Sequence, residues 1–142
     1  TVKIASILTK NRPQILSASL TFDTAKDVDI FGGIMMKYPD GCVVETAFGF
    51  DHFYQCNLEI WGSHGKLTAD RIFTAGPGIS PKITIETASE NKIIEVEPDN
   101  HFVNLLHDFA SQIHNNNFEH AYSAIILQAE LLEEVKEAAK KH

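Results

Sequence analysis

Polar and apolar side chains alternate along much of the first two thirds of the chain. Between Ile15 and Asp23, the apolar positions are Leu16, Ala18, Leu20 and Phe22, and the intervening ones are Ser17, Ser19 and Thr21. A period of two predicts a strand with one buried face, here the face that carries Leu16 to Phe22. Comparable runs predict further strands at residues 27–37, 42–49, 54–61, 66–70, 82–87 and 92–96.

Glycine and proline mark the connections between these strands. Tyr38-Pro39-Asp40-Gly41 predicts a tight turn, because proline presets φ and glycine accepts a positive φ. The strands on either side of this turn should therefore form a hairpin. Within the first of them, Gly32-Gly33 predicts a bulge or the close approach of a neighbouring backbone.

The last third of the chain changes to a helical period. Asp99 and Asn100 have the side chains that start helices, and Asn115 to Asn117 should end the helix that follows. Its apolar stripe consists of Phe102, Leu105, Leu106, Phe109, Ala110 and Ile113. A second helix is predicted at 120–141, with a seam of Ala124, Leu127, Leu131, Val135 and Ala138, widened by Ile125, Ala129 and Leu132. Glu137 and Lys141 are expected to pair on it, and a short helix at 1–9 should stop at Pro13.

Strands followed by helices are typical of the α+β class. We expect a single domain over residues 1–142, with an open, mostly antiparallel sheet of about six to seven strands and helices packed on one face. The other face should contact a further surface, because a strand that exposes Leu16, Leu20 and Phe22 is too apolar for water alone. The first apolar helical residues follow Thr1 directly, so we also expect the chain to be a fragment of a longer protein.

Composition excludes some classes of function. The formal charge is −7, from 19 acidic and 12 basic residues, and without a Lys/Arg cluster such a chain is a poor nucleic-acid binder. No apolar run approaches the ~20 residues that span a bilayer. Cys42 and Cys56 lie in strand-like segments without CxxC spacing, and we expect two buried thiols in a reducing cytoplasm.

Gly62-Ser63-His64-Gly65 has the composition of a metal or phosphate loop, and equally that of a tight turn. A phosphate loop leads into a helix N-terminus, whereas this segment leads into a predicted strand. A metal site needs further ligands at short spacing. The histidines offer no such pair: they are His52, His64, His101, His107, His114, His120 and His142. We therefore interpret the segment as a turn between two strands.

The remaining candidates lie in loops beyond strand ends. Asp51-His52 and Tyr54 follow Phe50, without a nucleophile motif such as GxSxG. Arg71 and Phe73 precede a flexible loop at 75–78, and an arginine beside an aromatic ring suits an anionic or sugar-phosphate ligand. The alternative is an exposed arginine over a packed phenylalanine. No GxGxxG follows a strand, so any dinucleotide-binding motif lies outside this chain.

These motifs, in this order, resemble the C-terminal domain of the glucose–fructose oxidoreductase / inositol dehydrogenase / MocA family of NAD(P)-dependent oxidoreductases. The resemblance covers nearly the whole chain, and its most specific piece is the turn at 58–67, LEIWGSHGKL, followed by RIFT at 71–74. The other matching pieces are the helix 2–8, the strand 15–23, YPDGC at 38–42, FGF at 48–50 and DNHF at 99–102.

The resemblance implies a dihydrodipicolinate-reductase-like or glyceraldehyde-3-phosphate-dehydrogenase-like C-terminal fold that binds substrate and forms homodimers or tetramers through its open sheet face. It implies an N-terminal Rossmann domain for NAD or NADP, a catalytic lysine and a His or Tyr, all outside this chain, which alone should not transfer hydride. Trp61, Arg71 and Phe73 look most like members acting on sugars or nucleotide-linked sugars. His52, Tyr54, Arg71 and Phe73 are the expected substrate-binding residues of a cytoplasmic enzyme. The alternative is a stand-alone binding or assembly module that dimerises through its sheet.

Overall fold

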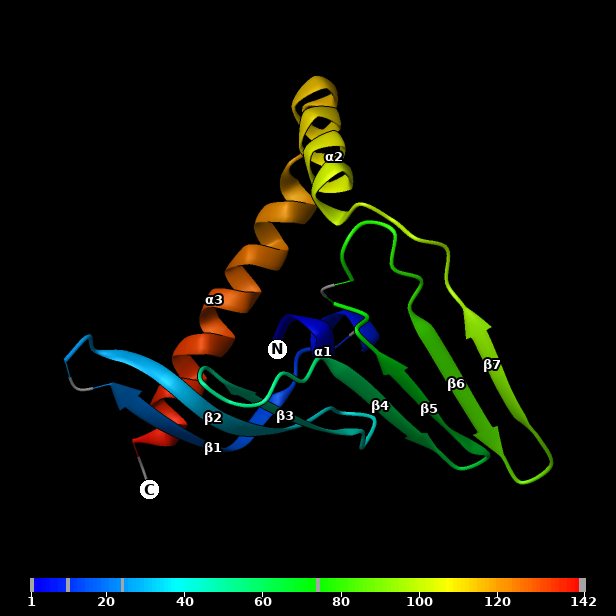
Figure 1. The fold of residues 1–142 in the computed structure, drawn as a ribbon. Helices are drawn as coiled ribbons and strands as arrows, with labels where there is room; N and C mark the ends of the chain where they lie inside the picture. The colour runs from blue at the N-terminus through cyan, green and yellow to red at the C-terminus, as the bar shows by residue number, and fades with distance from the viewer. Residues whose placement is uncertain (1, 10, 24, 74, 141–142) are drawn as a thin grey trace. The chain divides into compact units, whose positions relative to one another are not determined.

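A computed structural model describes residues 2–9, 11–23, 25–73 and 75–140 of the chain (Figure 1). In chain order its elements are α1 (Val2–Leu8), β1 (Gln14–Asp23), β2 (Val28–Lys37), β3 (Val43–Gly49), β4 (Asn57–Gly62), β5 (Gly65–Asp70), β6 (Lys82–Thr87), β7 (Asn91–Glu95), α2 (His101–Asn115) and α3 (Glu119–Ala139). These bounds follow the predicted segments closely. The largest difference is the start of β4, which lies three residues later than the alternation suggested.

The described strands pair in antiparallel fashion, which confirms the α+β class. They form two sheets, with the orders β1-β2-β3 and β4-β5-β6-β7, where the sequence predicted one open sheet. The division falls at residues 50–56, which connect β3 to β4 without strand structure. Alternation within each strand is a local signal, and it does not reveal which strands share hydrogen bonds.

The chain forms two compact units. The first contains residues 1–52 and 117–142, hence α1, β1 to β3 and α3, and the second contains residues 53–116, hence β4 to β7 and α2. Each unit is described below by its own contacts. The single domain over residues 1–142 stays a prediction.

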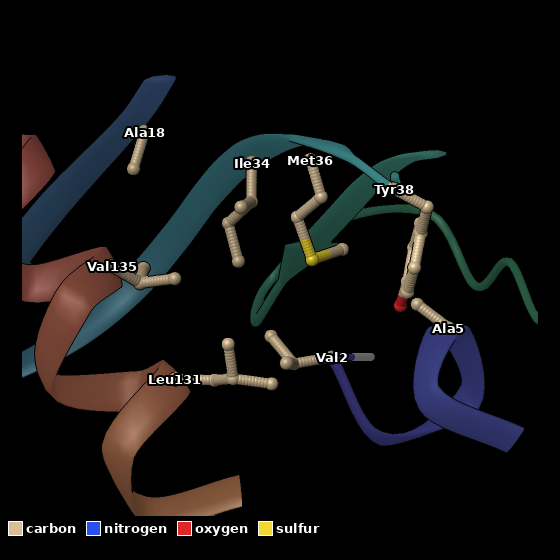
Figure 2. Packing of buried hydrophobic residues seen from close by; sticks show 8 residues of the cluster. All are labelled: Val2, Ala5, Ala18, Ile34, Met36, Tyr38, Leu131 and Val135. Carbon is tan, nitrogen blue, oxygen red and sulfur yellow. The ribbon is translucent and has the colours of Figure 1, made fainter. Parts of the chain in front are cut away.

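The first unit holds a hydrophobic core between its sheet and its two helices. Figure 2 shows Ile34, Met36 and Tyr38 of the β2 region facing Leu131 and Val135 of α3 and the α1 side chains. The full cluster of buried residues is Val2, Ala5, Ala18, Ile34, Met36, Tyr38, Leu131 and Val135. The seam predicted for α3 is thus confirmed in its C-terminal half, while Ala124, Ile125, Ala129 and Leu132 are exposed.

The strand β1 departs from the predicted alternation at its start. The register against β2 shifts between Ile15, which pairs with Met36, and Ser17, which pairs with Met35. The extra residue of this β-bulge is Leu16, which is 43% exposed, while Ile15 packs against the core. The prediction that Leu16 belongs to the buried face is therefore wrong, because a bulge reverses the alternation on one side of it.

A second shift, between Thr21 and Phe22, accompanies the exposure of Phe22 at the other end of β1. At Gly32 the predicted close approach is confirmed, since a Cβ there would lie 2.6 Å from the carbonyl oxygen of Ser19. The two register shifts between β1 and β2 lie elsewhere than at the two glycines.

Ion pairs connect α3 to the segment before β1. Arg12 forms ion pairs with Glu130 and Glu134, which lie one turn apart on α3. The side-chain hydrogen bonds from Arg12 to these two carboxylates raise the pKa of Arg12. Glu137 pairs with Lys140 at 2.7 Å, whereas its predicted partner Lys141 lies outside the described residues.

In the second unit, strand register separates an apolar from a polar sheet face. Directly paired residues share a face, so Leu58, Ile60, Leu67, Ala69, Ile83, Ile85 and Ile94 lie together. The opposite face carries the ion pairs Lys66–Glu86 and Lys82–Glu95, with Nζ to carboxylate distances of 2.9 and 3.0 Å. Of the apolar set only Ala69 is fully buried.

The helix α2 begins and ends as predicted. The Asn100 side chain accepts a hydrogen bond from the backbone N–H of Val103, and Asn116 adopts φ 50° to end the helix. Its apolar stripe, however, is exposed: Phe102 is 76%, Leu106 66% and Phe109 60% accessible. The prediction that both long helices pack on a sheet face therefore holds for α3 and not for α2.

The two cysteines are less buried than predicted. Cys42 is exposed beside the turn that precedes β3, and Cys56, just before β4, is half-buried. The prediction of two buried thiols is wrong because both residues lie at strand starts rather than strand centres.

Candidate functional site

The Gly-Ser-His-Gly segment is a hairpin turn, as the sequence predicted. Gly62 of β4 pairs with Gly65 of β5, so Ser63 and His64 form the two-residue connection. The hydroxyl of Ser63 lies 2.8 Å from Nδ1 of His64, and both side chains are exposed. Gly65 must be glycine because a Cβ there would lie 2.4 Å from the carbonyl oxygen of Glu86 on β6.

His52 lies just after β3 in the first unit, where the backbone turns back. Asp51 adopts φ 57°, and Nδ1 of His52 lies 2.8 Å from the carbonyl oxygen of Phe50. Because a carbonyl oxygen only accepts, Nδ1 is the protonated nitrogen and Nε2 is the acceptor of the neutral ring. The ring meets Phe31 edge to face with centroids 5.5 Å apart. Backbone and ring contacts thus fix the orientation of this imidazole.

Tyr54 and Arg71 come together in the second unit. The guanidinium carbon of Arg71 lies 5.5 Å from the centroid of the Tyr54 ring, which is cation–π geometry. Arg71 follows β5 directly, with φ 55°, and its backbone N–H donates to the carbonyl of Cys56 at 2.6 Å. A positive φ is unfavourable for a side-chain-bearing residue and is typical of functional positions held by their surroundings.

Phe73 lies two residues beyond Arg71 and is 40% exposed. The aromatic partner of Arg71 is therefore Tyr54 rather than the sequence neighbour Phe73. Of the four predicted substrate-binding residues, the structure joins Tyr54 and Arg71 in one contact. Phe73 lies in the same unit, and His52 belongs to the other unit.

Sequence reasoning missed an open depression beside the hairpin turn. This open hollow of about 580 Å³ is bordered by Glu59, Trp61, His64, Lys66 and Glu86, among others. The Trp61 indole N–H donates to Glu59, and the ring is 81% exposed. The signal was present in the alternation of residues 57–62, which places Glu59 and Trp61 on one face. This alternation alone did not predict the hollow, because Glu86 comes beside Lys66 only through the pairing of β6 with β5.

A second shallow hollow, of about 550 Å³, lies on the sheet of the first unit. It forms over Gly33, where small neighbours such as Ser19 and Ala47 in adjacent strands leave space, and Met35 and Glu45 border it. The hollow belongs to the sheet face opposite Ile34 and Met36, which point into the core.

The described ranges hold neither a metal-binding cluster nor a helix that could span a membrane. No group of three or more His, Cys, Asp or Glu side chains there is arranged to hold a metal ion. None of the helices in those ranges combines the length and apolarity needed to cross a lipid bilayer. Arg71 and its aromatic partner remain the arrangement best suited to an anionic ligand.

Comparison with known proteins adds family information, although no protein-family model matches the chain. The chain is 29% identical over 125 residues to dTDP-3,4-didehydro-2,6-dideoxy-alpha-D-glucose 3-reductase from Streptomyces antibioticus, which covers 87% of this chain and 38% of that protein. The protein of the same name from Actinomadura kijaniata is 25% identical over 128 residues, covering 89% and 39%. The chain thus spans about two fifths of the length of these curated relatives.

Solved structures share the fold. KijD10, a 3-ketoreductase from Actinomadura kijaniata in complex with TDP-benzene and NADP, matches in its open conformation with a TM-score of 0.90. The match has 22% sequence identity and covers 96% of this chain and 44% of that chain. The matched stretch is the C-terminal part of these reductases. Together these matches confirm the resemblance to the glucose–fructose oxidoreductase / inositol dehydrogenase / MocA family, over the C-terminal part of its members.

Proposed function

We propose that residues 1–142 form the substrate-binding part of an NADP-dependent oxidoreductase that reduces a ketone on a dTDP-linked deoxysugar. The observation that carries this proposal is the agreement among relatives. Four curated proteins, from two Streptomyces species, Saccharopolyspora spinosa and Actinomadura kijaniata, match the chain and share the name dTDP-3,4-didehydro-2,6-dideoxy-alpha-D-glucose 3-reductase.

The geometry around Arg71 supports a nucleotide-linked substrate. A nucleoside diphosphate offers pairs of anionic oxygens, and a guanidinium donates two parallel hydrogen bonds to such pairs. The Tyr54 ring and the Cys56 carbonyl restrain the side chain and the backbone of Arg71, which lowers the entropy lost when a ligand binds. In this proposal Arg71 binds the diphosphate, and Tyr54 and Phe73 provide aromatic surface beside it.

We assign NADP to residues outside this chain. A dinucleotide fold of the Rossmann type is built on parallel strands with helical crossovers, whereas the paired strands that the structure describes are antiparallel. The nicotinamide, when bound, supplies the hydride. This chain then contributes binding and orientation, and the groups that move the proton belong to the remainder of the polypeptide.

His52 is the candidate residue of the first unit. Its Nδ1–H is committed to the Phe50 carbonyl, so Nε2 is the nitrogen that would accept a hydrogen bond from a sugar hydroxyl. The contact with Phe31 restrains the ring in this orientation. Replacing His52 by Asn should therefore weaken binding of a hydroxylated sugar more than binding of dTDP itself.

The same proposal includes oligomerisation through the open face of the β1-β2-β3 sheet. The hollow over Gly33, bordered by Met35, has the small side chains that allow close approach of a second sheet. Met35→Glu should shift the protein toward monomer in sedimentation equilibrium, whereas Lys3→Glu on α1, away from this sheet face, should not. An unchanged oligomer in Met35→Glu would exclude this face.

The function is tested with the protein from the full reading frame that contains residues 1–142. NADPH oxidation should be followed with a dTDP-linked 3-keto-deoxysugar, with the free sugar and with unrelated nucleotide sugars, and NADH should be compared with NADPH. The proposal expects turnover that depends on the dTDP group. A protein that neither binds NADPH nor turns over any nucleotide sugar would favour the alternative of a non-catalytic assembly module.

A further inference from the structure

The helix α2 is well formed and yet has an uncovered apolar stripe. Both ends have defined caps, at Asn100 and Asn116, so the helix does not depend on a tertiary contact for its limits. The stripe consists of side chains that are 55 to 76% exposed, namely Phe102, Leu105, Leu106, Phe109 and Ile113. A contiguous apolar surface of this kind is rarely left to water and marks an interaction site.

The scarcity of charged residues on α2 indicates which kind of partner its apolar stripe would bind. Asp108 is the only charged residue among His101 to Asn115 when histidines are neutral, and the helix has no Lys or Arg. A helix that binds a membrane surface carries basic residues along its polar face, so a lipid partner does not fit. Depletion of charge around aromatic and aliphatic side chains is instead typical of the central part of protein interfaces.

We propose that the α2 stripe packs against the nicotinamide-binding part of the same polypeptide, an inference that rests on the proposed function. The matched region accounts for 44% of the KijD10 chain, so more than half of that NADP-bound protein lies outside it. An equivalent remainder of this protein would be tethered to the helix. Tethering raises the effective concentration of a partner to the millimolar range, so a small interface suffices.

The size of the stripe favours a tethered partner over a second copy. Two phenylalanines and three aliphatic side chains at these exposures offer roughly 500 Å² on one side, or about 1,000 Å² with the partner counted. That area lies within the range of interfaces between domains of one chain. It is at the lower limit of what separate chains bury in a specific complex.

The test compares one substitution in two contexts. Phe109→Asp places a charge within the stripe, and Ser111→Asp places the same charge two residues along on the opposite side of the helix. In the 142-residue chain both variants should keep the wild-type thermal midpoint, because Phe109 and Ser111 are already exposed there. In the full-length protein Phe109→Asp should lower the midpoint by several degrees, or split one transition into two, and Ser111→Asp should not.

Two further measurements in the full-length protein keep the inference separate from the proposed function. Limited proteolysis should cut Phe109→Asp faster than Ser111→Asp, while both full-length variants should still bind NADPH. Equal midpoints and equal proteolysis for the two variants would overturn the docking of α2 even if the enzyme is active. A drop in oligomer size caused by Phe109→Asp would overturn it in favour of a second copy. A wild-type full-length protein that does not bind NADPH would instead contradict the proposed function.

Discussion

The guanidinium of Arg71 lies over the ring of Tyr54, with 5.5 Å between the guanidinium carbon and the ring centroid. The two residues flank the β4-β5 hairpin, and the contact forms because the backbone N–H of Arg71 is bonded to the carbonyl of Cys56, just before β4. The hairpin therefore places a cation and an aromatic ring beside one another at its open end. This arrangement leads to a kinetic and a thermodynamic prediction.

In the full-length enzyme, Arg71→Ala should raise KM for the nucleotide sugar and lower kcat/KM by about tenfold or more, because a charge-assisted bond to the diphosphate is lost. Arg71→Lys should give an intermediate value, since lysine keeps the charge without the planar fork. Steady-state kinetics measure both. Lys82→Ala, which removes a cation from the polar face of the same unit, is the control and should behave as wild type. Wild-type kinetics in Arg71→Ala would remove this residue from the substrate site.

The positive φ of Arg71 predicts a difference between two substitutions that remove the same side chain. Arg71→Gly and Arg71→Ala both lose the contact with Tyr54, yet only glycine adopts φ 55° without strain. Arg71→Gly should therefore unfold with a free energy about 1 kcal/mol higher than Arg71→Ala. Urea denaturation of the 142-residue chain measures this difference. Equal stabilities would mean that the backbone at residue 71 relaxes.

The two glycines of the hairpin should differ sharply in their tolerance of alanine. A Cβ on Gly65 would lie 2.4 Å from the Glu86 carbonyl oxygen, whereas one on Gly62 would lie 3.5 Å from its nearest neighbour, the Gly65 carbonyl oxygen. Gly65→Ala should destabilise the protein by about 1–3 kcal/mol, because β5 and β6 must separate. Gly62→Ala should change the unfolding free energy little. Thermal or chemical unfolding of both variants measures this difference. Similar losses of unfolding free energy would show that turn geometry rather than strand spacing governs this hairpin.

The Lys66–Glu86 pair predicts a loss of stability at high pH. The hydrogen bond to Glu86, aided by the charges of Glu86 and Glu59, raises the pKa of Lys66 above its ordinary 10.5. A pKa raised by folding means that protonated Lys66 stabilises the native state fully below pH 10.5. That contribution is lost as the pH rises through the raised pKa.

Glu86→Gln removes the main cause of this shift, so its unfolding free energy should fall less steeply above pH 10.5 than that of wild type. The difference should be small and should shrink with added salt, because both side chains of the pair are over two-fifths exposed. Urea denaturation on either side of pH 10.5 measures it, with Glu90→Gln as a control that removes a carboxylate from the β6-β7 turn. Identical slopes for wild type and Glu86→Gln at low salt would contradict this account.

Much of the local structure follows from the sequence because its determinants lie within a few residues. Alternation located the strands, Pro39 and Gly41 located a turn in which Gly41 adopts φ 91°, and Asn100 located the start of α2. The turn at Ser63-His64 was also predictable, since the flanking segments read as strands. For the site, sequence reasoning selected Arg71 and Tyr54 as separate candidates and did not pair them, because their contact depends on the register of β4 against β5.

The sequence by itself determined which residues form strands and helices, and the α+β class. Only the tertiary structure decided that the seven described strands form two sheets, that a bulge turns Leu16 outward, and that the close approach of β6 requires glycine at residue 65. It also decided that the stripe of α2 is uncovered while the C-terminal half of α3 is buried. The physical reason is that periodicity depends on neighbours along the chain, whereas coverage of a face depends on elements far away in sequence.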